Sequence, residues 1–361
     1  MLRLALTTAL VVMVAGAVAD IPRTPGGKPD LTGFYDSGTL TPLNRPEYFG
    51  DKQFMTQEEA AEIVERERAR LARLDKLSDP NRGAPEAGGT GNNGGGNITF
   101  DTLPPAASGG VGGYNSFWTE PGSFVSEVDG KYRTSIIYDP PNGRQRPMTE
   151  KGRRIRAQNF TSFSYENDGT ASWLAKSGPG PFDGPETVAL SERCMLGFSV
   201  GPPSLPGHYN NFKRIVQTED HVMILLEMVH DARIIRLNSE HAPDVNRKWL
   251  GDAIGWWEGD TLLVETKNFK EQTGLYGGDE NLHVVERFQK LDNGNLLYNF
   301  TVTDPTIWEQ PWSGEYIWKA SEDLVYEYAC HEGNYSMGNI LRGARILESE
   351  YTGPVAGSGE E

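Results

Sequence analysis

Residues 282–302 read LHVVERFQKLDNGNLLYNFTV and contain two alternating runs around a polar turn at 292–295. Every second position of the first run, from Leu282 on, is apolar except Glu286, and the second run alternates in the same way. Alternation with a period of two is typical of a half-buried β-strand, and Asn-Gly favours a tight hairpin turn. The segment therefore predicts an antiparallel hairpin.

Similar runs lie on both sides of this hairpin. The expected strands are 212–217, 222–230, 231–237, 254–257, 261–266, 282–289, 296–302, 311–319 and 324–330. The run at 231–237 either continues the strand before it or bends into the next one. An earlier hairpin is expected to turn at Asp129-Gly130. Parallel strands need crossover connections of about a dozen residues, usually helices, and these runs have none. We therefore expect a mainly β fold, an antiparallel meander that forms a barrel or a strongly curved sheet.

The chain divides into an N-terminal region and a β-rich globular domain at 114–350. Residues 20–113 have many Pro and Gly residues and predict an extended arm, a helix and a flexible linker. The helix, at 56–77, is amphipathic and begins with a capping box at Thr56. We expect it to pack on its own domain; a protein partner that binds residues 20–77 is the alternative.

Residues 1–19 have the pattern of a cleavable secretory signal. Arg3 precedes an apolar run that ends in Ala17-Val18-Ala19. The run is shorter than the roughly 20 residues that a membrane-spanning helix needs. We therefore expect a periplasmic or secreted protein with no membrane span.

Composition excludes one class of partner. The chain has 361 residues, with 34 Lys+Arg against 50 Asp+Glu, and its formal net charge is −16. Nucleic acids and anionic lipids bind clustered basic charge, which this chain lacks. We expect no nucleic-acid partner. The 42 Gly and 23 Pro residues favour turns and short strands over helical bundles.

Cys194 and Cys330 are the only two cysteines. An oxidising compartment would allow a disulfide between them, and two separate buried thiols are the alternative. A disulfide would also exclude Cys330 as a nucleophile beside His331. Because the sequence has no HExxH, HxH, EF-hand or dinucleotide-binding pattern, we expect no metal and no cofactor.

Ionisable side chains interrupt the apolar face of the expected sheet. On the expected alternation, His230, Glu286 and Glu332 point to the same, aromatic side. Ionisable groups in an aromatic cavity can act as acid/base catalysts, and each can equally belong to a structural hydrogen-bond network. The catalytic candidates are His230, Glu286, Glu332 and His331.

Aromatic side chains on that face predict a binding site for a small apolar or aromatic molecule. Asp231 and Arg233 are expected on the opposite face, where they hold the strand or bind a polar group at the rim. The ligand-binding candidates are Asp231, Arg233, Tyr298, Trp312, Tyr316, Tyr326 and Tyr328.

Several longer strings carry a resemblance. They are SERC (191–194), VHDARII (229–235), WEGDTL (257–262), LHVVERF (282–288) and YEYACHEGNY (326–335). Together they resemble a family of exported bacterial proteins, and this resemblance implies no particular activity. The strand meander is also similar in outline to the lipocalin-like (calycin) barrels.

The sequence leaves two classes of function open. The first is an exported small-molecule-binding β-barrel that performs acid/base chemistry as a lyase, hydratase, isomerase or hydrolase. The alternative is a non-catalytic carrier or a cell-envelope interaction protein. An aromatic interior with ionisable residues favours the first.

Overall fold

The structure is a computed structural model, which describes residues 21–74, 81, 120–159, 168–197, 200–273, 275 and 278–356. The predicted signal peptide and most of the predicted linker lie outside these residues. None of the helices in the described part is long and apolar enough to cross a membrane.

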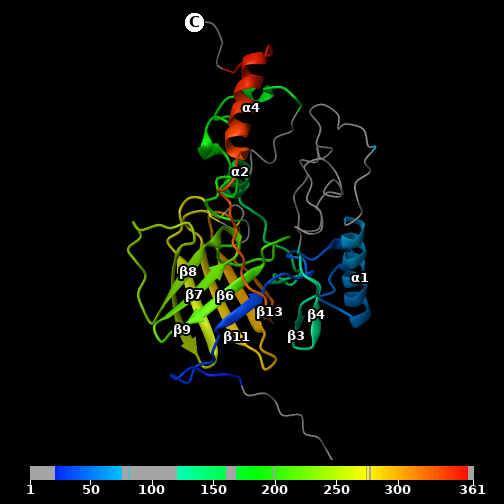
Figure 1. Cartoon of the computed structure of the whole chain (residues 1–361), viewed down its shortest axis with the longest axis vertical. Helices are drawn as coiled ribbons and strands as arrows, with labels where there is room; N and C mark the ends of the chain where they lie inside the picture. The colour runs from blue at the N-terminus through cyan, green and yellow to red at the C-terminus, as the bar shows by residue number, and fades with distance from the viewer. Residues whose placement is uncertain are drawn as a thin grey trace, which may run out of the picture.

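Nine strands form a closed barrel within the described residues (Figure 1). Around the ring they are β1 (Gly33–Asp36), β6 (Phe212–Gln217), β7 (His221–Leu226), β8 (Ala232–Leu237), β9 (Asp252–Glu258), β10 (Thr261–Lys267), β11 (His283–Lys290), β12 (Leu296–Thr303) and β13 (Trp312–Ser321). The last strand, β13, pairs with β1 and so closes the ring. A further strand, β5 (Ile137–Asp139), pairs with the other end of β13. The predicted mainly β fold and the predicted barrel are confirmed.

One neighbouring pair in the ring, β8 and β9, runs parallel, and the other pairs run antiparallel. Strands that alternate in direction can close a ring only when their number is even, so nine strands need one parallel pair. Residues 238–251 provide it, because they cross from the end of β8 back to the start of β9 without a helix. The predicted meander had only antiparallel neighbours, and this crossover is where the barrel departs from it.

Two segments differ from their predictions. Residues 33–36, which lie in the predicted extended arm, form β1 because Tyr35 enters the core and two strands flank the segment. The strand predicted at 324–330 is wrong, since these residues form an irregular segment. The neighbouring positions beside β13 are already taken by β12, β5 and β1.

Inward-facing side chains fill the barrel with an aromatic core. The ring of Tyr298 lies 5.6 Å from that of Tyr316 and 4.7 Å from that of Trp318, centroid to centroid. Residues 200–206 are buried in the same core. The Ser204 N–H donates to Tyr298 Oη at 2.9 Å, and the Ser204 carbonyl accepts from Tyr316 Oη at 2.9 Å. This segment therefore occupies part of the barrel interior.

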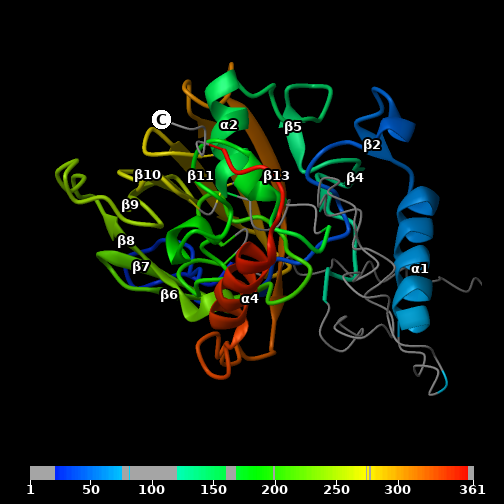
Figure 2. The ribbon, with the colours of Figure 1, turned by 90° about the horizontal axis from the view of Figure 1, so that it is seen from above.

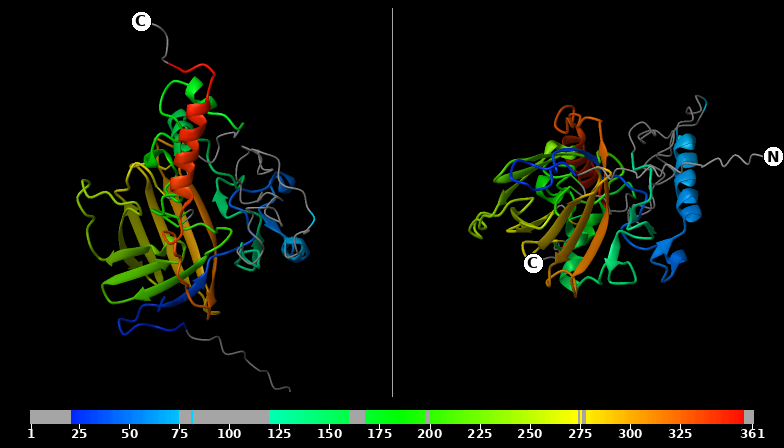
Figure 3. Two further views of the ribbon diagram at one scale, coloured as in Figure 1. Left: turned by 45° about the horizontal axis from the view of Figure 1, so that its top comes forward. Right: turned by 90° about the horizontal axis from the view of Figure 1, so that it is seen from below.

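A small sheet and a helix flank the barrel. They are β2 (Phe54–Met55), β3 (Glu127–Val128), β4 (Lys131–Arg133) and α1 (Gln57–Leu74). The predicted capping box is present: Thr56 N–H donates to Glu59 Oε2 at 2.7 Å, and Glu59 N–H donates to Thr56 Oγ1 at 3.3 Å. Ala60 packs in one cluster with Met55 and Val125. Figures 2 and 3 show α1 on the side of β13, away from β9 and β10.

Two more helices, α2 (Glu150–Asn159) and α4 (Ser336–Glu350), lie above one end of the barrel in Figure 1. The segment that leads from β13 to α4 is fixed by the disulfide between Cys194 and Cys330. The predicted disulfide is therefore confirmed. It joins parts of the chain that are 136 residues apart in sequence.

Candidate functional site

The predicted inward carboxylate, Glu286 on β11, is fully buried (0% exposed) and has two side-chain partners. Arg233 on β8 makes a two-point contact: its NH1 donates to Oε1 at 2.9 Å, and its NH2 donates to Oε2. Tyr298 Oη donates to the same carboxylate at 2.7 Å. Burial raises the pKa of Tyr298 well above its usual value, which keeps this hydroxyl a donor. The inward position of Glu286 is confirmed, and a catalytic role for it stays a prediction.

A turn after β7 explains why the predicted faces of His230 and Arg233 are wrong. β7 ends at Leu226, and the φ angles of Val229 and His230 are 60° and 44°. This left-handed backbone reverses the chain instead of continuing the strand. Alternation therefore restarts at Ala232, and Arg233 points into the barrel.

Several other candidates lie outside the barrel interior. Those that are exposed are His230, Tyr326, His331 and Glu332. The ring Nδ1 of His230 lies 3.1 Å from the carbonyl oxygen of Tyr328, which is itself partly buried against the core. Asp231 is half-buried beside the turn, and burial raises the pKa of its carboxyl. The predicted grouping of His230 and Glu332 with Glu286 on one inner face is therefore wrong.

Three aromatic candidates do face the interior as predicted: Tyr298, Trp312 and Tyr316. They pack against other aromatic rings, such as Phe300 against Trp312 at 5.7 Å between centroids. With residues 200–206 also inside, side chains and backbone of this chain occupy part of the region expected to hold a ligand. The aromatic candidates are therefore part of the hydrophobic core.

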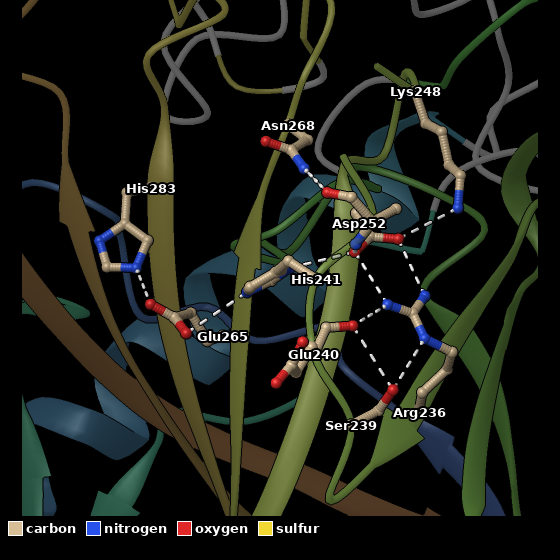
Figure 4. Close-up of polar contacts among 10 residues, drawn as sticks. Arg236, Ser239, Glu240, His241, Lys248, Asp252, Glu265, Asn268 and His283 are labelled. Carbon is tan, nitrogen blue, oxygen red and sulfur yellow. Dashed lines mark hydrogen bonds and ion pairs between the residues drawn. The ribbon is translucent and has the colours of Figure 1, made fainter. Parts of the chain in front are cut away.

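A second polar cluster lies on the outer wall, where the crossover at 238–251 meets β9 (Figure 4). Asp252, the first residue of β9, has a fully buried carboxylate. Arg236 donates to both of its oxygens at 2.9 and 3.0 Å, Lys248 Nζ to one at 3.2 Å, and the Ala242 N–H to the other at 2.9 Å. Burial raises the pKa of Asp252, but these hydrogen bonds outweigh it and hold the pKa well below its usual value.

Two histidines and a second carboxylate extend this cluster toward solvent (Figure 4). His241 Nδ1 lies 3.1 Å from Asp252 Oδ2, and His241 Nε2 lies 3.3 Å from Glu265 Oε2. The other oxygen of Glu265 lies 2.7 Å from His283 Nε2. The side chains are 0% exposed at Asp252, 9% at His241, 30% at Glu265 and 38% at His283. Burial raises the pKa of Glu265, and contacts with both imidazoles lower it to a net value below the usual one.

Strand register brings Glu265 and His283 together. Val264 and Thr266 are buried in the barrel, so Glu265 between them points outward. β10 and β11 pair Glu265 with Val285, which makes His283 its diagonal neighbour on the outer face. These outward positions place the pair on the accessible wall of the barrel.

His283 is held so that one of its ring nitrogens is available to a ligand. Nε2 faces a carboxylate, which only accepts hydrogen bonds, so Nε2 is the donor, and in this tautomer the lone pair of the ring lies at Nδ1. No group in the described part of the chain hydrogen-bonds to this Nδ1. A carboxylate that fixes the tautomer of a histidine is how acid/base histidines are oriented. Within the described residues, no three His, Cys, Asp or Glu side chains are arranged to hold a metal ion.

None of the four residues of this cluster, Asp252, His241, Glu265 and His283, is among the candidate site residues predicted from the sequence. Alternation alone could place Glu265 and His283 on the outer faces of neighbouring strands. The register that aligns them depends on how the chain connects β10 to β11, which the alternation does not show. His241 comes from the crossover, which has no periodic pattern. The sequence therefore carried a signal for one pair and none for the whole cluster.

Comparisons of the chain with family models, with curated proteins and with solved structures find no match. The resemblance to exported bacterial proteins and the likeness to lipocalin-like barrels therefore stay predictions.

The carboxylates of Asp252 and Glu265 are expected to make stability depend on pH in acid. Each has a folded-state pKa below its unfolded value of about 4. Each therefore stabilises the folded state fully above that pH. The contribution is lost as the pH falls through the folded pKa. In denaturant titrations at a series of pH values, Asp252→Asn should therefore flatten the fall in unfolding free energy below about pH 4.

Asp244→Asn, which changes an exposed carboxylate in the same crossover, is the control and should leave the pH dependence as it is. Parallel curves for the wild type and Asp252→Asn would contradict this account.

Proposed function

We propose that the protein is an exported enzyme that performs acid/base chemistry on a small apolar or aromatic molecule, with His283 as the acid/base residue. The observation that carries the proposal is the hydrogen-bonded series from Asp252 through His241 and Glu265 to His283, whose Nδ1 faces no partner within the described residues. Export is supported by the disulfide, because disulfides persist in oxidising compartments.

In the proposed reaction, a proton of the substrate passes to Nδ1 of His283, and its bonding electron pair stays on the substrate. The ring becomes an imidazolium, and Glu265 stabilises its charge through the Nε2–H. His241 contacts the second oxygen of Glu265 and so fixes the orientation of the first. Return of the proton to another substrate atom completes an isomerisation, and its transfer to a leaving group completes a lyase reaction.

A direct test uses 5-nitrobenzisoxazole, an aromatic molecule whose ring opens when a base removes its C–H proton. The bonding pair forms the nitrile, the N–O bond breaks, and the phenolate product absorbs visible light. His283→Asn is expected to lower the rate by about 100-fold or more, since a general base contributes about 10²–10⁴-fold. Glu265→Gln should lower it by about tenfold, because the amide cannot stabilise the imidazolium with a full charge.

His221→Asn is the matched control. His221 is also exposed, and its Nδ1 lies 2.9 Å from Asp220, but the pair is not continued by a buried carboxylate. This variant should keep the wild-type rate. If His283→Asn, shown by circular dichroism to be folded, also keeps that rate, the enzyme proposal is overturned. The cluster would then serve only to hold the crossover, and the non-catalytic carrier would be the better interpretation.

A further inference from the structure

Apolar side chains occupy the outer wall next to His283. In cross-strand register, Glu265 pairs with Ile254 on one side and Val285 on the other. The next outward position on β10, Leu263, pairs with Trp256. We call Ile254, Trp256, Leu263 and Val285 the outer apolar patch, in which Leu263 is buried (5% exposed) and the other three are partly exposed. Residues on the solvent side of a sheet are usually polar. A contiguous apolar patch on that side therefore marks a contact surface.

The neighbouring part of the wall is covered by the chain itself. Arg133 on β4 pairs with Glu315 on β13, and Asn299 on β12 donates to Tyr138 Oη at 3.0 Å on β5. Figure 2 shows β4, β5 and α1 gathered on this side of the barrel, while β9 and β10 lie on the other. The outer apolar patch lies beyond these covered strands, on the side of the crossover.

One exposed cation borders the patch. Arg287 points outward from β11 and pairs in register with Leu263. It makes no ion pair with any residue that the structure describes. Arg287 and His283 are four residues apart on one strand, so their Cα atoms are separated by about 13 Å. A guanidinium at this distance suits the planar oxygens of a carboxylate or sulfonate on a molecule of two-ring size.

We propose that the substrate is a flat apolar or aromatic molecule that carries one anionic group. Its apolar body lies on the outer apolar patch, its anionic group binds Arg287, and its reactive proton faces Nδ1 of His283. This substrate class rests on the proposed function of His283, although the binding surface can be tested independently of it.

A matched pair of fluorescent probes tests the proposal. 1-Anilinonaphthalene-8-sulfonate and N-phenyl-1-naphthylamine share one aromatic skeleton and differ in the sulfonate. The wild type is expected to bind the sulfonate more tightly. Arg287→Met should weaken sulfonate binding by about tenfold or more, the value of a charge-assisted hydrogen bond. It should change binding of the neutral probe by less than about twofold, and Val285→Asp should weaken both probes.

Arg214→Met is the control, because Arg214 is an exposed arginine on β6 whose guanidinium lies 5.2 Å from the Phe34 ring centroid. Equal sulfonate affinity in wild type and Arg287→Met would overturn the proposed substrate class. Proton-transfer rates with 5-nitrobenzisoxazole, which has no anionic group, would still decide the proposed function. Conversely, a sulfonate preference that depends on Arg287, together with an unchanged rate in His283→Asn, would overturn the proposed function and support the binding surface.

Discussion

Replacing Arg233 with Met is expected to lower the free energy of unfolding by about 3–5 kcal/mol, the usual effect of removing one partner of a buried ion pair. The substitution leaves the fully buried Glu286 without its cation, and Tyr298 alone cannot neutralise a carboxylate in the core. Urea denaturation followed by tryptophan fluorescence would measure the loss.

Two comparisons separate this effect from a general loss of packing. Arg233→Met combined with Glu286→Leu removes both charges and should recover most of the stability, since apolar replacements of buried pairs are often neutral. Arg23→Met breaks an exposed ion pair with Asp260 and should cost about 1 kcal/mol or less. A similarly small loss of unfolding free energy in Arg233→Met would show that the buried Glu286 carboxylate does not require Arg233 for stability.

Removal of the disulfide by the double substitution Cys194→Ser and Cys330→Ser is expected to cost about 5 kcal/mol. This value follows from the loop-closure entropy of two positions 136 residues apart in the chain-entropy account. Denaturant titrations of wild type with and without reductant should show the same loss. The double variant should not respond to reductant, and a reductant-sensitive double variant would contradict the assignment of the effect to this bond.

The regular part of the barrel was predictable from the sequence because each strand of a hairpin carries its own alternation. Glu286 is inward because it shares a face with Val284 and Phe288, and this could be predicted within one strand. The capping box at Thr56 and the turn at Asp129 are equally local. Such features depend on residues a few positions apart, where side-chain direction follows from backbone geometry.

The unpredicted features depend on contacts between distant segments. The turn at Val229 and His230 reverses the phase of alternation, although VHDARII itself has no glycine or proline to mark it. β1 is a four-residue strand, too short for a period, and it is ordered by β6 and β13. Tyr326 and Tyr328 alternate like a strand but have no free neighbour to pair with beside β13.

The candidate site shows the same limit. His283 could be placed on an outward face, yet its partner Glu265 is identified only by the register between β10 and β11. His241 and Asp252 require the parallel crossover, which follows from the odd number of strands in the ring. An alternating pattern predicts individual strands, but it does not determine how many strands form the closed ring.

The pairing of β1 with β13 also sets an order of events during synthesis. β1 is the first barrel strand to leave the ribosome, and its partner β13 is the last, with 286 residues between Phe34 and Ser321, which pair in register. The strands from β9 to β13 pair with strands that are close in sequence, so these hairpins can form as soon as both strands have been synthesised. The ring, in contrast, cannot close until almost the whole chain is available. Until then β1 is an edge strand in need of protection from other chains.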